Sequence, residues 1–216
     1  MIKAVIFDVD GVLLDSEEIH YGVEAEALRR FGIPATKELT RQYSGIRLDV
    51  EFTAIAKKFN KTISLEEAIK ERDKILKDAL KKGFPKAPFV KQVLDQLSKK
   101  YLLAFATMGE ERFVGEEMKT SKLQLYFKVS IFGENVSNPK PNPEIFLKAA
   151  KLLGVKPNEC VVVEDSEIGI KAGKNAGTIV IARKASHNKS ADLSLADFIV
   201  KDLRDIPQIL ENLQIR

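Results

Sequence analysis

Apolar positions follow two different rhythms along the chain. A short apolar run over residues 2–7 stops at Asp8, and from residue 16 to residue 84 apolar residues recur at the three- and four-residue spacing typical of amphipathic helices. From residue 85 onward short apolar runs alternate with helical segments. We expect strands over residues 102–106, 129–132, 160–164, 178–182 and 198–200, and helices over residues 89–99, 110–122, 143–153, 166–175 and 203–213.

Alternation of strands and helices predicts an α/β fold, because parallel strands need crossover connections that are usually helical. With the first strand added, the pattern indicates a doubly wound parallel sheet, a Rossmann-like core made of residues 1–15 and 85–216. Residues 16–84, in which we find no convincing strand, form an all-helical insertion and the second domain. Ligands of such sheets bind beyond the carboxyl ends of the strands.

Two carboxylates follow the first strand. Asp8 and Asp10 are two residues apart, so they can point the same way at the end of the strand, and Gly11 allows the chain to turn there. Two neighbouring carboxylates repel each other, and a divalent cation relieves that repulsion. The alternative is an ordinary turn, since Asp and Gly are common turn residues.

Other polar residues stand where later apolar runs end. Thr107 follows the run over residues 102–106, Lys140 lies in a proline-rich loop, and Glu164 and Asp165 follow residues 161–163. Each has a structural alternative: a hydroxyl at a strand end, a loop lysine, and acidic residues before a helix N-terminus near Ser166. Their shared place at one sheet edge favours a site for phosphoryl transfer.

Four strings carry a resemblance to a known family. In order along the chain, they are Asp8-Val9-Asp10-Gly11-Val12-Leu13-Leu14-Asp15-Ser16, Ala106-Thr107, Lys140-Pro141-Asn142-Pro143-Glu144-Ile145-Phe146 and Val163-Glu164-Asp165-Ser166. Together they resemble the haloacid dehalogenase superfamily of phosphatases and phosphomutases over nearly the whole chain. The third and fourth strings are similar to the subgroup that contains β-phosphoglucomutase and small sugar-phosphate phosphatases.

This resemblance implies a role for each strand-end residue. Asp8 is expected to be the nucleophile that forms an aspartyl phosphate, and Asp10 the acid and base in turn, with its backbone carbonyl on the metal. Lys140 and Thr107 are expected to bind phosphoryl oxygens. Glu164 and Asp165 are expected to complete an oxygen-only Mg²⁺ site with Asp8 and Asp10, Asp165 directly and Glu164 through water.

The helical insertion corresponds to the small cap of these proteins, where substrate choice is expected to reside. His20 matches a position at which β-phosphoglucomutases carry a histidine that helps position the catalytic acid; the alternative is a polar residue on a helix face. Arg47 lies near the place where a mutase arginine holds the non-transferring phosphate, or it is simply solvated. Both are candidate substrate-binding residues.

The function that follows is a Mg²⁺-dependent phosphatase acting on a small phosphorylated metabolite, such as a sugar phosphate. One alternative is a hexose phosphomutase of the β-phosphoglucomutase type, which needs a second phosphate site. A non-enzymatic phospho-accepting switch also uses strand-end acids, threonine and lysine. It lacks both a helical cap and an acid at the position of Asp10.

Composition narrows the class of protein. Of the 216 residues 44% are hydrophobic and 31% charged, and the net charge of +4 comes from intermixed lysine and glutamate rather than a basic stripe, so we expect no nucleic-acid partner. Short apolar runs and the absence of a signal-peptide pattern lead us to expect no membrane association and a cytoplasmic location. We also expect a monomer.

The cysteine and the second histidine are expected to be unimportant for the chemistry. Cys160 is the single cysteine, so an intramolecular disulfide and a thiolate metal cluster are excluded, and we expect a packed, inert thiol. His187, in a polar loop, is expected to be exposed.

Overall fold

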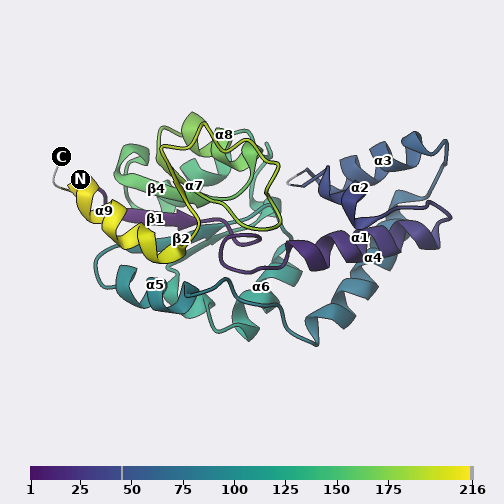
Figure 1. Ribbon diagram of the computed structural model, residues 1–216, viewed down its shortest axis with the longest axis horizontal. Helices are drawn as coiled ribbons and strands as arrows, with labels where there is room; N and C mark the ends of the chain where they lie inside the picture. Colours follow the sequence, from purple (N-terminus) through teal and green to yellow (C-terminus); the bar gives the residue numbers. More distant parts are fainter. Residues whose placement is uncertain (45, 215–216) are drawn as a thin grey trace. The chain divides into compact units, whose positions relative to one another are not determined.

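The computed structural model describes residues 1–44 and 46–214. Gly45, Ile215 and Arg216 lie outside the described residues, and with them the expected end of the core at residue 216. The chain forms two compact units, one made of Met1–Asp15 with Pro85–Arg216 and the other of Ser16–Phe84 (Figure 1). None of the helices in the described parts of the chain is both long and apolar enough to cross a lipid bilayer.

The first unit is built on one parallel sheet, in the order β3-β2-β1-β4-β5-β6. Every neighbouring pair in it is parallel. Its strands are β1 (Ala4–Phe7), β2 (Leu102–Ala106), β3 (Val129–Ile131), β4 (Cys160–Glu164), β5 (Ile179–Arg183) and β6 (Phe198–Val200). The predicted doubly wound parallel sheet is therefore confirmed, with β1 between β2 and β4.

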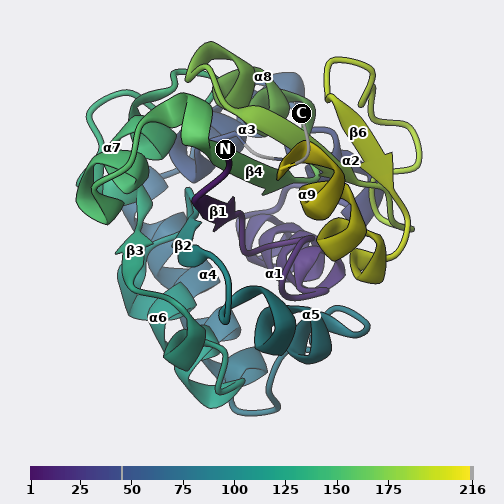
Figure 2. The ribbon, with the colours of Figure 1, turned by 90° about the vertical axis from the view of Figure 1, so that its left-hand side faces the viewer.

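Helices cover both faces of this sheet. They are α5 (Val90–Leu97), α6 (Glu111–Thr120), α7 (Glu144–Leu153), α8 (Glu167–Asn175) and α9 (Ile206–Gln214). Because strand side chains alternate, Val5 and Phe7 pack with α5, α6 and α9, whereas Ala4 and Ile6 pack with α7 and α8. Figure 2 shows α7 and α8 on one side of the sheet and α5 and α9 on the other. Burial on both faces explains why the strands read as continuous apolar runs.

Two strands differ from the prediction by one residue at their ends. The third strand stops at Ile131 rather than residue 132, and the fifth covers Ile179–Arg183 rather than 178–182. Arg183 is buried although it is charged, because its Nη1 donates to the carbonyl oxygen of Gly11 (2.6 Å) and to Asp15 Oδ1 (2.7 Å). Arg183, one residue beyond the predicted strand, is thus the last residue of β5.

Cys160 is fully buried at the start of β4, and burial raises the pKa of its thiol to about 11. The expectation of a packed thiol is confirmed, and at neutral pH the group stays in its unreactive protonated form.

The second unit consists of helices with a core of their own. They are α1 (Glu17–Arg30), α2 (Lys37–Arg41), α3 (Leu48–Lys58) and α4 (Leu65–Leu80). Leu28, Phe52 and Ile55 are among the side chains that fill the core. Helix α4 begins directly after Ser64, whose side chain caps it by accepting a hydrogen bond from the backbone N–H of Glu67 (3.3 Å).

Glu51 on α3 is an acid inside this helical unit, 3% exposed, and its Oε1 has no hydrogen-bond partner among the described residues. Burial raises the pKa of Glu51 to about 10; Glu24 and Glu17 add to the shift, and Arg72 opposes it. Between its ordinary value of 4.5 and about 10, folded chains hold a proton here that unfolded chains lose. The stability that the protonated Glu51 contributes is therefore fully present below the pKa of the unfolded chain. It is lost as the pH rises from that pKa toward the pKa of the folded chain.

We expect Glu51→Gln to raise the free energy of unfolding at pH 7.5 by about 1–3 kcal/mol, because the amide carries no titrating proton. The variant should also flatten the pH dependence of stability. Urea unfolding at pH 5.5 and pH 7.5 measures both effects, with the exposed Glu66→Gln on α4 as the matched control. Parallel stability profiles for wild type and Glu51→Gln would contradict the prediction.

Candidate active site

The candidate nucleophile directly follows the central strand. The backbone N–H of Asp8 donates to the carbonyl oxygen of Val163 (2.9 Å), which fixes the residue between β1 and β4, and its side chain is buried. Lys140 Nζ lies 2.6 Å from Asp8 Oδ1 and 2.6 Å from Glu164 Oε1, and all three side chains are shielded from water. A buried ammonium group thus bridges two buried carboxylates from different strands.

The charges of this cluster act on one another. Burial raises the pKa of Asp8 well above its ordinary value; Lys140 lowers it again in part, and the nearby carboxylates Glu164, Asp165 and Asp10 raise it further. For Lys140 burial lowers the pKa, but the charges of Asp8 and Glu164 raise it by more, so that the net shift is upward. Lys140 therefore remains a cation at every physiological pH.

Glu164 is held by protein donors through both of its oxygens. Oε2 accepts hydrogen bonds from the backbone N–H groups of Asp165 (2.8 Å) and Ser166 (3.0 Å) and from the Ser166 hydroxyl (3.0 Å). Oε1 accepts from Lys140. A Cβ at Gly169 would lie 1.8 Å from Oε1, so the start of α8 must lack a side chain there to admit this carboxylate. This geometry makes Glu164 a support for Lys140, and its contact with Mg²⁺ through water stays a prediction.

Thr107 and Asp10 flank the backbone at Gly109. Thr107 is buried just beyond β2, and its Oγ1 accepts a hydrogen bond from the backbone N–H of Gly109 (3.0 Å). A Cβ at Gly109 would lie 3.3 Å from Thr107 Oγ1 and 3.8 Å from Asp10 Oδ2. The turn that carries Asp10 continues through Gly11, whose φ of +72° suits glycine. Residues from the ends of β1 and β2 are thereby brought together.

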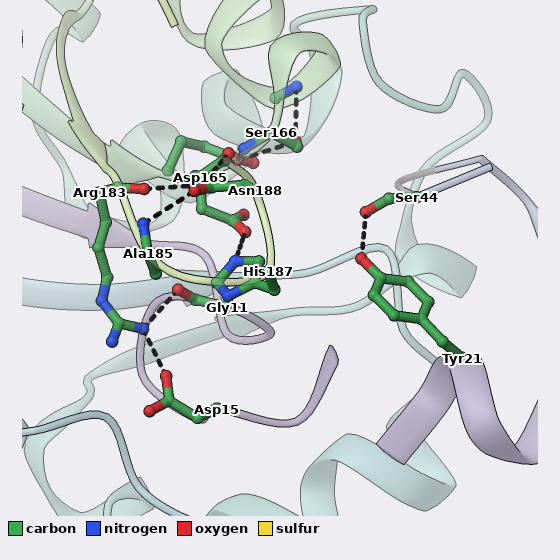
Figure 3. A network of polar contacts seen from close by, with 12 residues as sticks. Gly11, Asp15, Tyr21, Ser44, Asp165, Ser166, Arg183, Ala185, His187 and Asn188 are labelled. Atoms are coloured by element: carbon green, nitrogen blue, oxygen red, sulfur yellow. Dashed lines mark hydrogen bonds and ion pairs between the residues drawn. The ribbon is translucent and has the colours of Figure 1, made fainter. Parts of the chain in front are cut away.

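Asp165 lies at the centre of a polar network that includes His187 (Figure 3). His187 Nε2 is 2.6 Å from Asp165 Oδ2, and Asn188 Nδ2 donates to the carbonyl oxygens of Asp165 (2.8 Å) and Arg183 (2.8 Å). The expectation that His187 is exposed is wrong, because only 9% of this residue is accessible. Polar side chains are buried here since they bind polar partners.

Sequence reasoning assigned no role to His187, Asn188 or Arg183. One signal was available. Arg183 is a polar residue at the end of an apolar strand, as Glu164 is, and Asp8 and Thr107 directly follow theirs. A polar Ser-His-Asn string comes soon after Arg183. The partners of these three residues lie far away along the chain, at Gly11, Asp15 and Asp165.

The acidic residues suit a hard divalent cation. Burial raises the pKa of Asp165 well above its ordinary value; Glu164 and Asp10 also raise it, while Lys140 and Arg183 oppose the shift. Asp10 has the same upward effect on Asp8, so the three aspartates lie within electrostatic reach of one another. Carboxylate and carbonyl oxygens are the ligands Mg²⁺ prefers. Asp8, Asp10 and Asp165 therefore fit such an ion by their chemistry.

His20 and Arg47 belong to the helical unit. The His20 ring packs edge-on against Phe84, with ring centroids 5.4 Å apart. Arg47 precedes α3 and is exposed, and its Nε and Nη2 donate to Asp49 Oδ1 (3.0 Å) and Oδ2 (2.7 Å). Their binding of substrate stays a prediction.

Comparison with known proteins identifies the family of this chain. Residues 5–183 match the model of the haloacid dehalogenase-like hydrolases. A phosphorylated carbohydrates phosphatase from Thermotoga maritima is 34% identical over 181 residues, which are 82% of each chain. The β-phosphoglucomutase of Bacillus subtilis is 25% identical over 212 residues, 95% of this chain and 92% of that protein.

A solved structure agrees with the fold. The β-phosphoglucomutase of Clostridium difficile superposes with a TM-score of 0.84 at 23% identity and covers 100% of both chains. On the match over residues 5–183 and the similarity to the Thermotoga phosphatase, the chain belongs to the haloacid dehalogenase-like hydrolase family.

Proposed function

We propose that this hydrolase is a Mg²⁺-dependent phosphatase that cleaves a small phosphomonoester, such as a sugar phosphate, through an aspartyl phosphate on Asp8. One observation carries the proposal: a buried aspartate at the end of the central strand lies 2.6 Å from a buried lysine that Glu164 also holds. A carboxylate set beside a permanent cation is suited to approach an anionic phosphate. The similarity to a phosphorylated carbohydrates phosphatase supports the substrate class.

In the first step, an oxygen of Asp8 attacks phosphorus in line with the ester oxygen. Since Lys140 binds Oδ1, we assign the attack to Oδ2. The bond between phosphorus and the ester oxygen breaks, its electron pair goes to the leaving oxygen, and Asp10 gives that oxygen a proton. The sugar leaves as an alcohol, and the phosphoryl group stays on Asp8.

In the second step, water attacks the same phosphorus atom. Asp10, now a carboxylate, takes a proton from this water, and the bond from phosphorus to Asp8 breaks with its electron pair returning to the carboxylate. Inorganic phosphate leaves and both aspartates regain their starting states. One residue thus serves as acid and then as base.

Other residues bind the phosphoryl group. The Thr107 hydroxyl and the Lys140 ammonium group donate to its oxygens, and Glu164 keeps Lys140 in place. Asp8, Asp10 and Asp165 would hold Mg²⁺, which supplies positive charge that offsets the repulsion between Asp8 and the phosphate. The helical unit is proposed to select among leaving groups, with His20 and Arg47 as candidates.

We expect Asp10→Asn to lower turnover of an alkyl phosphate by about 100-fold or more, the usual effect of losing an acid and base. Formation of the aspartyl phosphate should recover when the substrate is an aryl phosphate, because a phenolate leaves without a proton. Rapid-quench measurements of both substrates test this difference. An unchanged rate with the alkyl phosphate would remove Asp10 from the mechanism.

Phosphomutase activity is the second candidate, favoured by the similarity to the β-phosphoglucomutase of Bacillus subtilis. A mutase needs a second phosphate site, and the candidate residue Arg47 is held by both oxygens of Asp49. We therefore place the phosphatase first. Sugar phosphates incubated with protein and Mg²⁺, with and without a sugar bisphosphate, distinguish the two, since a phosphatase releases inorganic phosphate and a mutase accumulates the isomer. Loss of turnover in a chelator, restored by Mg²⁺, tests the cofactor.

A further inference from the structure

We propose that His187 is a positioning residue for metal binding: it fixes the Asp165 carboxylate through Oδ2 so that Oδ1 is directed to the cation. This inference rests on the proposed function, and it assigns a task to a loop that the proposed mechanism does not use. His187 touches neither substrate nor metal in this account; it acts through Asp165.

The contact itself restricts the carboxylate. His187 Nε2 and Asp165 Oδ2 are 2.6 Å apart, and both side chains are buried. A carboxylate has two oxygens and turns about its bond to Cβ, so a donor on one oxygen sets the direction of the other. The backbone of Asp165 is held as well, because Asn188 Nδ2 donates to its carbonyl oxygen at 2.8 Å. Neighbouring residues of one loop thus hold Asp165 at both its backbone and its side chain.

This loop has anchors of its own. The backbone N–H of Ala185 donates to Asn188 Oδ1 (2.8 Å), and the backbone N–H of Lys184 donates to the carbonyl oxygen of Val200 (2.7 Å). Asn188 also binds the carbonyl oxygen of Arg183 at 2.8 Å. The loop that carries the His187 ring is therefore held by its own hydrogen bonds, of which Figure 3 shows those of Asn188 with Ala185 and Arg183.

Hydrogen bonds also connect this part of the chain to the turn that carries Asp10. Arg183 Nη1 binds the carbonyl oxygen of Gly11 and Asp15 Oδ1. A Cβ at Gly11 would lie 2.1 Å from Asp165 Oδ2 and 2.7 Å from His187 Nε2. The turn, the acid and the imidazole therefore meet at one point, where only a glycine fits. Groups behind a metal ligand orient it and commonly change metal affinity 10- to 100-fold when removed.

Three variants of the full chain separate positioning from plain stability. His187→Leu keeps bulk but removes the ring nitrogen, His187→Gln keeps an N–H donor on a side chain of similar reach, and Lys189→Ala changes an exposed residue of the same loop. Isothermal titration of Mg²⁺ into metal-free protein gives the dissociation constant independently of catalysis. Thermal unfolding in chelator gives the stability of each variant.

We expect His187→Leu to weaken Mg²⁺ binding by about 10- to 100-fold, with turnover at saturating Mg²⁺ within a few-fold of wild type. His187→Gln should restore most of the affinity, and Lys189→Ala should bind as wild type does. If His187→Leu does not fold, the shorter donor of His187→Asn takes its place and should also bind Mg²⁺ more weakly than His187→Gln. Wild-type Mg²⁺ affinity in His187→Leu, or in His187→Asn where His187→Leu does not fold, would overturn the inference alone, whatever the melting temperature of the variant. A wild-type protein that binds no Mg²⁺ would overturn the proposed function as well.

Discussion

Asp8→Asn should lower turnover of a sugar phosphate by at least about 10⁴-fold, because the amide keeps the shape of the side chain but cannot attack phosphorus. The fold should survive, since Lys140 keeps its second partner, Glu164, at 2.6 Å. Steady-state release of inorganic phosphate at saturating Mg²⁺ measures the loss, and thermal unfolding verifies the structure.

Asp205→Asn is the matched control for this change, since Asp205 is exposed in the same unit. Its turnover should equal that of wild type. If Asp8→Asn retained a tenth or more of the wild-type rate, Asp8 would not be the nucleophile.

Lys140→Met should reduce kcat/KM by about 10³-fold or more, because a charged donor to the phosphoryl oxygens is lost. It should also destabilise the protein by about 3–5 kcal/mol, since removing one member of a buried ion pair leaves the other members without compensation. Here the group left behind is a pair of buried carboxylates, Asp8 and Glu164. Urea unfolding in chelator and phosphate release in Mg²⁺ measure the two effects separately.

A second substitution tests whether charge is the cause. Adding Glu164→Gln to Lys140→Met removes one of the two stranded carboxylates, so stability should recover in part while kcat/KM stays low. Lys151→Met, which changes an exposed lysine on α7, is the control and should alter neither quantity. If Lys140→Met kept wild-type kcat/KM, the proposed phosphate-binding role would be lost.

The sheet and its edge could be predicted from the sequence because both depend on local pattern. Strands buried on both faces read as apolar runs, as over residues 161–163, and alternation with helices leaves few topologies. Parallel strands end at the same edge, so the sequence predicts that Asp8, Thr107 and Glu164 lie near one another. The contact of Lys140 with both Asp8 and Glu164 agrees with that expectation.

The hydrogen bonds that hold the site residues in place could not be predicted, because they join residues remote in the sequence. Arg183 is buried through Gly11 and Asp15, more than 160 residues away along the chain, and His187 through Asp165. A polar residue is ordinarily predicted to be exposed to solvent. That prediction fails where a residue distant in the sequence supplies a hydrogen-bond partner for the buried side chain. The sequence shows that residue 164 is an acid, but it does not show the four donors that form hydrogen bonds to the two carboxylate oxygens of Glu164.

The most direct measurement is to trap the phosphoryl group on the protein. Asp10→Asn mixed with an excess of an aryl phosphate and Mg²⁺ should form the aspartyl phosphate, since the phenolate needs no proton, and should hydrolyse it slowly, since the base is missing. After an acid quench, peptide mass spectrometry should find one phosphate on the N-terminal peptide at Asp8, and hydroxylamine should remove it. Phosphate on another residue, or none on the protein while the phenol is released in a burst, would contradict covalent catalysis by Asp8.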